Sequence, residues 1–144
     1  MNKQSNSYII IYATVLVVVV AAMLAFAAIQ LQPMQQANIK IEKMGAILSS
    51  IGQGADAAEL AKNKTAYVEQ EYGKYIVDSY LVDASGEQVE GDAFGTLDNL
   101  GEAIAAGTYP VFIARMDNGK TEYIIPVTGK GLWGPVWGYI ALDE

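Results

Sequence analysis

The 144-residue chain contains no cysteine and no histidine. The absence of cysteine excludes disulfides, zinc–thiolate sites and a cysteine nucleophile. The absence of histidine removes the commonest general base and a common haem ligand. Any redox chemistry must therefore belong to a bound cofactor.

Basic residues are also scarce, since nine Lys and Arg face sixteen Asp and Glu, for a net charge of −7. All sixteen acidic residues lie after residue 33. Such a surface repels phosphate backbones, so we expect no nucleic-acid partner. The carboxylates are scattered along the chain, and no pair of them suggests a general acid and base. We therefore assign no catalytic residue and no metal site.

One long window, residues 4–39, lacks charge altogether, and Tyr8 to Ile29 within it is almost wholly apolar. As a helix this stretch would be about 33 Å long, which is enough to cross a bilayer core of about 30 Å. The alternative is a cleaved secretory signal with an A-x-A site at Ala25-Phe-Ala27. The apolar run is longer than a signal core, so a retained membrane anchor is favoured. The flanking lysines, Lys3, Lys40 and Lys43, leave the orientation undecided.

Two amphipathic helices are predicted after the anchor. Pro33 either kinks a continuing helix or opens a new one. An apolar stripe at helical spacing follows and stops at Gly52 and Gly54; its members are Met34, Ala37, Ile41, Met44, Leu48 and Ile51. Asp56 and Glu59 resemble a capping box for a second helix that runs to about Tyr72 and ends at Gly73. We expect both stripes to serve core packing.

The remainder of the chain has the texture of β-structure. A strand over residues 75–82, the turn Asp83-Ala-Ser-Gly86 and a short return to Val89 predict a hairpin. A short helix is expected over residues 97–106, closed by Gly107. Strands over 109–116 and 121–127 flank Asn118-Gly119, a strong hairpin signal, and Pro126 suggests an edge or a strand end. The predicted fold is α+β: an N-terminal membrane anchor (1–32), a helical stalk and helix (33–72), and a small antiparallel-sheet head (73–144).

The segment Gly129-Lys-Gly-Leu-Trp-Gly-Pro-Val-Trp-Gly-Tyr-Ile-Ala-Leu142 combines two tryptophans with four glycines. Its G-x-G-x-x-G spacing suggests a dinucleotide fingerprint, but Pro135 and a strand-like stretch follow where a helix is needed. Glycines beside indoles would suit a planar aromatic ligand. Both tryptophans could equally plug the core beneath a turn. Lys130 could neutralise a phosphate or a flavin's electron-rich edge, or be an ordinary surface lysine.

This signature, the strand Tyr123-Ile-Ile-Pro-Val127 and the apolar first helix together resemble the C subunit of the sodium-translocating NADH:quinone oxidoreductase. The G subunit of the Rnf complex matches less closely. The resemblance implies a membrane-anchored electron-transfer flavoprotein subunit in the inner (cytoplasmic) membrane, with a single pass and a periplasmic head. Its partners would be the other subunits of the sodium-pumping complex and the membrane. By the same resemblance, Gly131, Leu132, Trp133 and Gly134 would border the ring of an FMN.

The chain departs from that family in one respect. The family attaches FMN through a threonine in a Ser-Gly-Ala-Thr-x-Thr motif, which this chain lacks, and Thr128 matches no attachment motif. We expect an N-terminal fragment, truncated at its C-terminus, that does not bind FMN covalently and whose activity alone is open. Ending at Glu144, within a probable strand, would leave the sheet unpaired and core surface uncovered.

Two other classes of protein remain as alternatives. A membrane-anchored extracytoplasmic sensor or binding head would also suit a stalk helix with a small mixed sheet. A pilin-like structural protein shares the apolar N-terminal helix and the β-rich head. It should carry a glycine-linked cleavage site and a glutamate inside the helix, and residues 1–29 contain neither.

Overall fold

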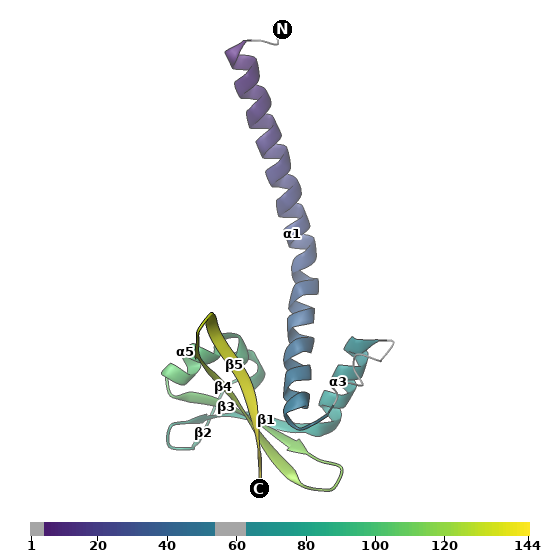
Figure 1. The fold of residues 1–144 in the computed structure, drawn as a ribbon, viewed down its shortest axis with the longest axis vertical. Helices are drawn as coiled ribbons and strands as arrows, with labels where there is room; N and C mark the ends of the chain where they lie inside the picture. The colour runs from purple at the N-terminus through teal and green to yellow at the C-terminus, as the bar shows by residue number, and fades with distance from the viewer. Residues whose placement is uncertain (1–4, 54–62) are drawn as a thin grey trace. The chain divides into compact units, whose positions relative to one another are not determined.

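The structure is a computed structural model that describes residues 5–53 and 63–144. Its chain forms two compact units, Met1–Lys40 and Ile41–Glu144. Figure 1 shows the helices and strands of each unit. The predicted division at residues 32 and 72 stays a prediction.

The first helix, α1 (Asn6–Ser50), contains Pro33 in its interior, so the helix continues through the proline. Every residue from Ile9 to Lys40 is exposed, including the long apolar run. The hydroxyl of Thr14 donates to the carbonyl of Ile10 at 2.8 Å, which satisfies this polar group within the helix. The helix is long and apolar enough to span a membrane, and a segment that is apolar on all sides suits lipid. These properties are consistent with a membrane anchor.

The last turns of α1 belong to the second unit and carry the amphipathic stripe. Ile41, Met44 and Leu48 are buried, whereas Met34 is 64% exposed, so the stripe begins later than predicted. The helix ends in a Schellman motif: Gln53 N–H donates to Leu48 C=O at 2.9 Å, and Gly52 has φ +72°. The predicted stop at Gly52 is confirmed.

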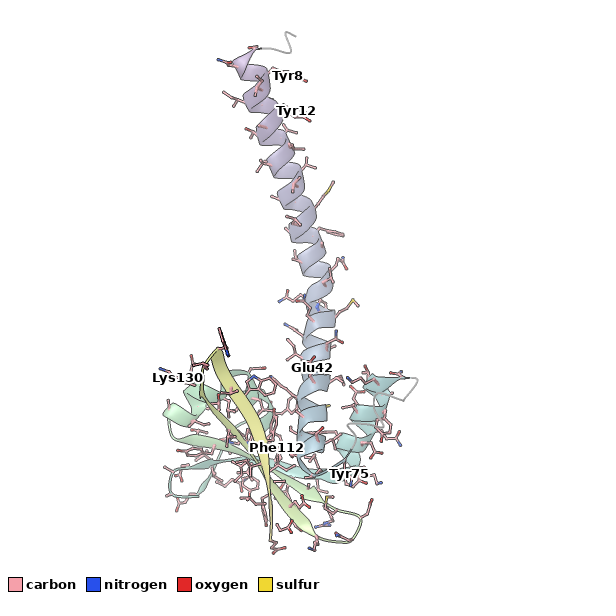
Figure 2. All side chains as sticks on the ribbon, in the orientation of Figure 1. Tyr8, Tyr12, Glu42, Tyr75, Phe112 and Lys130 are labelled. Carbon is pink, nitrogen blue, oxygen red and sulfur yellow. The ribbon has the colours of Figure 1, made fainter. Side chains whose placement is uncertain are left out.

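The next described helix, α3 (Lys64–Tyr75), is capped by Asn63, whose side chain accepts from the N–H of Ala66 at 3.2 Å. The predicted capping box of Asp56 and Glu59 lies outside the described residues. The predicted end at Gly73 is wrong, because the helix continues to Tyr75. Tyr75 is 3% exposed and its hydroxyl donates to Asp117 Oδ2 at 2.8 Å, so packing and a hydrogen bond extend the helix (Figure 2).

The head is built on one five-stranded sheet in which every neighbouring pair is antiparallel, in the order β2-β1-β3-β4-β5. Both predicted hairpins are present. The strands are β1 (Ile76–Asp83), β2 (Gln88–Val89), β3 (Thr108–Arg115), β4 (Thr121–Gly131) and β5 (Gly134–Asp143). The short helix predicted over residues 97–106 is divided into η1 (Leu97–Asn99) and α5 (Leu100–Ala105). A further short helix, α4 (Ala93–Thr96), precedes it and was not predicted. The α+β fold class is confirmed.

One face of the sheet forms the core with the helices. Phe112, Ala114 and Ile124 are each 0% exposed and share a cluster with Ile47 and Leu48 of α1. Cross-strand pairing places Phe112 opposite Ile124, so their side chains lie on the same face. The helices therefore cover this face, and the core depends on the register of β3 and β4.

The final strand is fully paired on one side. β5 pairs with β4 from Gly134 to Asp143, and among the described strands it forms an edge of the sheet. The expectation of an unpaired sheet therefore concerns only the outer side of β5, where no described strand pairs with it. Ile140 and Leu142, on the face opposite the core, are each 48% exposed.

The prediction that Pro126 marks an edge or a strand end is corrected by the structure. β4 continues to Gly131 and lies between β3 and β5. Pairing with β3 stops at Phe112–Ile124, and the same register would place Pro110 opposite Pro126 two residues further on. Neither proline has an N–H to donate, so the two strands separate at this point.

We expect the stability of the head to fall between pH 10 and pH 12 because of Tyr72. Burial, with smaller contributions from Tyr139 and Asp92, raises the pKa of Tyr72 to about 12. The unfolded chain ionises near the ordinary value of 10.0, whereas the folded chain keeps the proton until about 12. Stability from this group is thus complete below pH 10 and is lost as the pH rises through that window.

Urea unfolding of the wild type and of Tyr72→Phe at several pH values measures this effect. Tyr72→Phe should flatten the alkaline decline. An equally steep decline in the variant would contradict the assignment.

Candidate functional site

The predicted binding residues lie at the tip of the β4–β5 hairpin. Gly131 pairs with Gly134, and Leu132 and Trp133 form the two-residue turn between them. The turn leads directly into β5 and not into a helix, which rules out the dinucleotide fingerprint. We call residues 131–134 the hairpin tip.

Local geometry explains both glycines of the hairpin tip. Gly134 has φ +144°, which side chains rarely tolerate. A Cβ on Gly131 would lie 2.9 Å from the carbonyl oxygen of Gly134 and 2.9 Å from Cγ2 of Val136. Gly129, two residues earlier on the same strand, has no such neighbour within 4 Å. Only the tip glycines are therefore required by the turn.

The tip presents its large side chains to solvent. Leu132 is 91% exposed, Trp133 is 97% exposed and Trp137 is 64% exposed. The alternative in which both tryptophans plug the core is therefore wrong. The four tip residues do not line the pocket formed by Lys43, Asp98, Trp137 and their neighbours.

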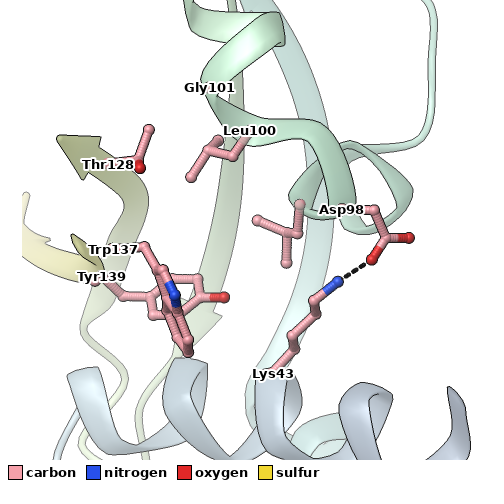
Figure 3. Close-up of a pocket in the computed structure, with 9 residues that line it drawn as sticks. Lys43, Asp98, Leu100, Gly101, Thr128, Trp137 and Tyr139 are labelled. Atoms are coloured by element: carbon pink, nitrogen blue, oxygen red, sulfur yellow. Dashed lines mark hydrogen bonds and ion pairs between the residues drawn. The ribbon is translucent and has the colours of Figure 1, made fainter. Parts of the chain in front are cut away.

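That pocket lies next to the hairpin and has a volume of about 330 Å³. It is bounded by the end of α1, by η1 and α5, and by β4 and β5 (Figure 3). Its lining residues are Lys43, Leu97, Asp98, Leu100, Gly101, Thr128, Trp137, Gly138 and Tyr139. This size is at the lower end of the range for small-molecule sites. The mixture of aromatic, aliphatic and polar groups is also typical of such sites.

The polar side of the pocket is an ion pair between Lys43 and Asp98 (Figure 3). The side chain of Lys43 is only 16% exposed, whereas that of Asp98 is 67% exposed. Lys130, the lysine that the sequence suggested, lies one residue before the hairpin tip and is exposed (Figure 2). The cation enclosed at the pocket is therefore Lys43.

The aromatic side of the pocket comes from β5. Trp137 pairs with Thr128 and Tyr139 pairs with Pro126, which places all four side chains on the same face of the sheet. The hydroxyl of Thr128 donates to the carbonyl of Val136 at 3.0 Å. Burial raises the pKa of the Tyr139 hydroxyl.

Sequence reasoning missed Lys43 and Asp98 as site residues. They are 55 positions apart, and each belongs to a stretch that reads as an ordinary helix surface. It noted both tryptophans as apolar surfaces for a planar ligand, but the resemblance assigned Trp133 to the site and left Trp137 out. No local signal distinguishes a pocket residue from a tip residue in a hairpin whose register is unknown.

Comparison with known proteins shows where this chain has relatives. No protein-family model matches it. The C subunit of the Na⁺-translocating NADH-quinone reductase of Neisseria meningitidis is 24% identical over 153 residues, covering 99% of this chain and 59% of that protein. The same subunit from Pseudomonas aeruginosa is 24% identical over 156 residues, covering 98% of this chain and 59% of its relative.

A solved structure supports the same relationship. The crystal structure of the C subunit from Parabacteroides distasonis matches with a TM-score of 0.67 and 37% sequence identity, covering 78% of this chain and 51% of that one. The chain is thus a distant relative of this subunit, and the resemblance and the fold are confirmed. It spans about 59% of the length of the curated relatives.

We predict that Gly131→Ala destabilises the head by about 1–3 kcal/mol, because the new methyl group would overlap a backbone oxygen that cannot easily move. Gly129→Ala is the matched control on the same strand, and it should change stability by less than about 0.5 kcal/mol. Denaturant unfolding of both variants measures the difference. Equal stabilities would show that the turn does not have this geometry.

Proposed function

We propose that this chain is an electron-transfer flavoprotein component of a sodium-pumping NADH:quinone oxidoreductase, equivalent to part of its C subunit. The observation that carries the proposal is the solved structure of that subunit, which is 37% identical and has the same fold over 78% of this chain. The chain would act as one component of the enzyme complex, and its partners would be the other subunits.

The apolar part of α1 supports a place in the membrane. We assign it to a single pass through the inner (cytoplasmic) membrane with the head on the periplasmic side. The exposed run from Ile9 to Ile29 would face lipid, where its side chains lose contact with water. Residues after Lys40 carry the acidic groups that suit an aqueous compartment.

The proposed cofactor is FMN, which when bound supplies the one- and two-electron chemistry that the side chains lack. The residues present fit a flat ring: Leu132 and Trp133 offer exposed apolar surface, and Gly131 and Gly134 lack side chains that would keep a ligand away from the backbone. We propose that these four residues border the flavin ring.

Within residues 1–144, we propose that the flavin is held by noncovalent contacts. The Ser-Gly-Ala-Thr attachment motif is absent from the sequence. Thr128, which lines the pocket, already donates its hydroxyl to Val136. Retention of FMN therefore depends on stacking and hydrogen bonds.

The test is to titrate the full chain, held in a lipid nanodisc, with FMN and to follow flavin fluorescence. Binding should quench the fluorescence, and Trp133→Ala should weaken binding by about two- to tenfold, since stacking on an aromatic ring contributes about 0.5–1.5 kcal/mol. Leu142→Ala is the control, because Leu142 is also exposed but lies at the far end of β5.

Two results would contradict the proposal. The first is the absence of FMN binding by the wild-type chain. The second is a fluorescent band after denaturing electrophoresis, which would show covalent attachment. Loss of binding in Leu142→Ala but not in Trp133→Ala would move the ring away from the hairpin tip.

A further inference from the structure

Trp137 lies outside the hairpin tip and offers a second aromatic surface. It lines the pocket together with Tyr139 and Gly138, yet its side chain is 64% exposed. An indole left this open at the wall of a pocket is an available stacking surface. Because the lining of the pocket also includes Leu97 and Leu100, its apolar part suits a flat aromatic ring.

The charges of the pocket indicate what kind of ring it accepts. Lys43 and Asp98 are the two charged residues in its lining, and they neutralise each other. A phosphate dianion would be repelled by the Asp98 carboxylate. An uncharged ring with carbonyl oxygens would not be repelled by Asp98. Lys43 has three N–H donors, and its ion pair with Asp98 uses one of them, so the others can donate to such a ring. The pocket therefore favours a neutral ring with hydrogen-bond acceptors on its edge.

The size and position of the pocket agree with this choice. Its volume of about 330 Å³ is at the lower limit for small-molecule sites, enough for a ring system without a sugar-phosphate tail. Trp137 lies three residues after Gly134 on β5, which corresponds to about 10 Å along the strand. That distance is close to the length of a fused three-ring system, so one ring could reach from the pocket to the tip.

We propose that the pocket holds the inner end of the flavin ring, with Trp137 stacked on it and Lys43 Nζ donating to a ring carbonyl. This rests on the proposed function and deepens it, since the hairpin tip then borders only the outer end of the ring. Asp98 is a positioning residue that holds the Lys43 ammonium at the pocket wall. The phosphate lies outside the pocket.

The chain contains only two tryptophans, which makes the test specific. The full chain in nanodiscs is labelled with 5-fluorotryptophan, and Trp133→Phe and Trp137→Phe assign the two ¹⁹F signals. Riboflavin, which has no phosphate, is then added. The proposal expects the Trp137 signal to shift on binding, together with that of Trp133.

Affinities provide the second measurement. Lys43→Met should weaken riboflavin and FMN binding by the same factor of about tenfold or more, because a hydrogen bond from a charged donor is lost. Lys120→Met, an exposed lysine at the opposite end of β4 from the hairpin tip, is the matched control and should change either affinity less than twofold. Thermal melting of each variant shows whether it is folded. If Lys43→Met does not fold, Lys43→Arg replaces it in the test, because it keeps the positive charge and changes only the shape of the donor.

Each outcome decides between the two proposals. A shift of Trp133 alone would overturn the pocket assignment and leave the proposed function intact. A shift of Trp137 alone would support the pocket and remove the hairpin tip from the site. Weakening of FMN but not riboflavin binding by Lys43→Met would make Lys43 a phosphate ligand and overturn the assignment. Failure of both flavins to bind the wild type would overturn the proposed function and this inference with it.

Discussion

The pairing of β4 with β5 is the constraint on which the rest of the head depends. It runs from Glu122–Asp143 to Gly131–Gly134 without interruption. Because paired residues share a face, this register places Thr128 beside Trp137 at the pocket and leaves the tip at the far end. A shift of one residue would move every side chain of β5 to the opposite face. The glycines of the tip protect the register, since they permit the tight turn.

The helix α1 changes character along its length, from wholly apolar to amphipathic. The first part of α1 is apolar on all sides, whereas its last turns bury one apolar face formed by Ile41, Met44, Ile47 and Leu48. Lys43 lies among these turns but off the stripe, which directs its side chain to the pocket instead of the core. Packing of the stripe against the sheet thus also positions the one enclosed cation of the described pocket. The helix α1 therefore contributes Lys43 to the pocket because Lys43 lies on a different face of the helix from the buried apolar residues.

Much of the fold could be predicted from the sequence, because its signals are local. Asn118-Gly119 and the turn before Val89 indicate their hairpins through backbone geometry alone. The Lys43–Asp98 pair could not be predicted, since it depends on the tertiary packing of segments far apart in the chain. The role of Pro126 was also hidden, because it depends on Pro110 in the neighbouring strand. Of the site, the sequence identified the segment 129–142 that is rich in glycine and tryptophan, but neither the hairpin that it forms nor the pocket beside it.

The central claim is that this head, related to the C subunit of the sodium-translocating reductase, binds a flavin ring between its hairpin tip and the adjacent pocket. The structure of the full chain determined with FMN bound tests it most directly. We expect the ring to contact Trp137 and Lys43 at one end and residues 131–134 at the other, with the phosphate in solvent. A flavin bound at another surface, or a phosphate seated against Lys43, would contradict the account.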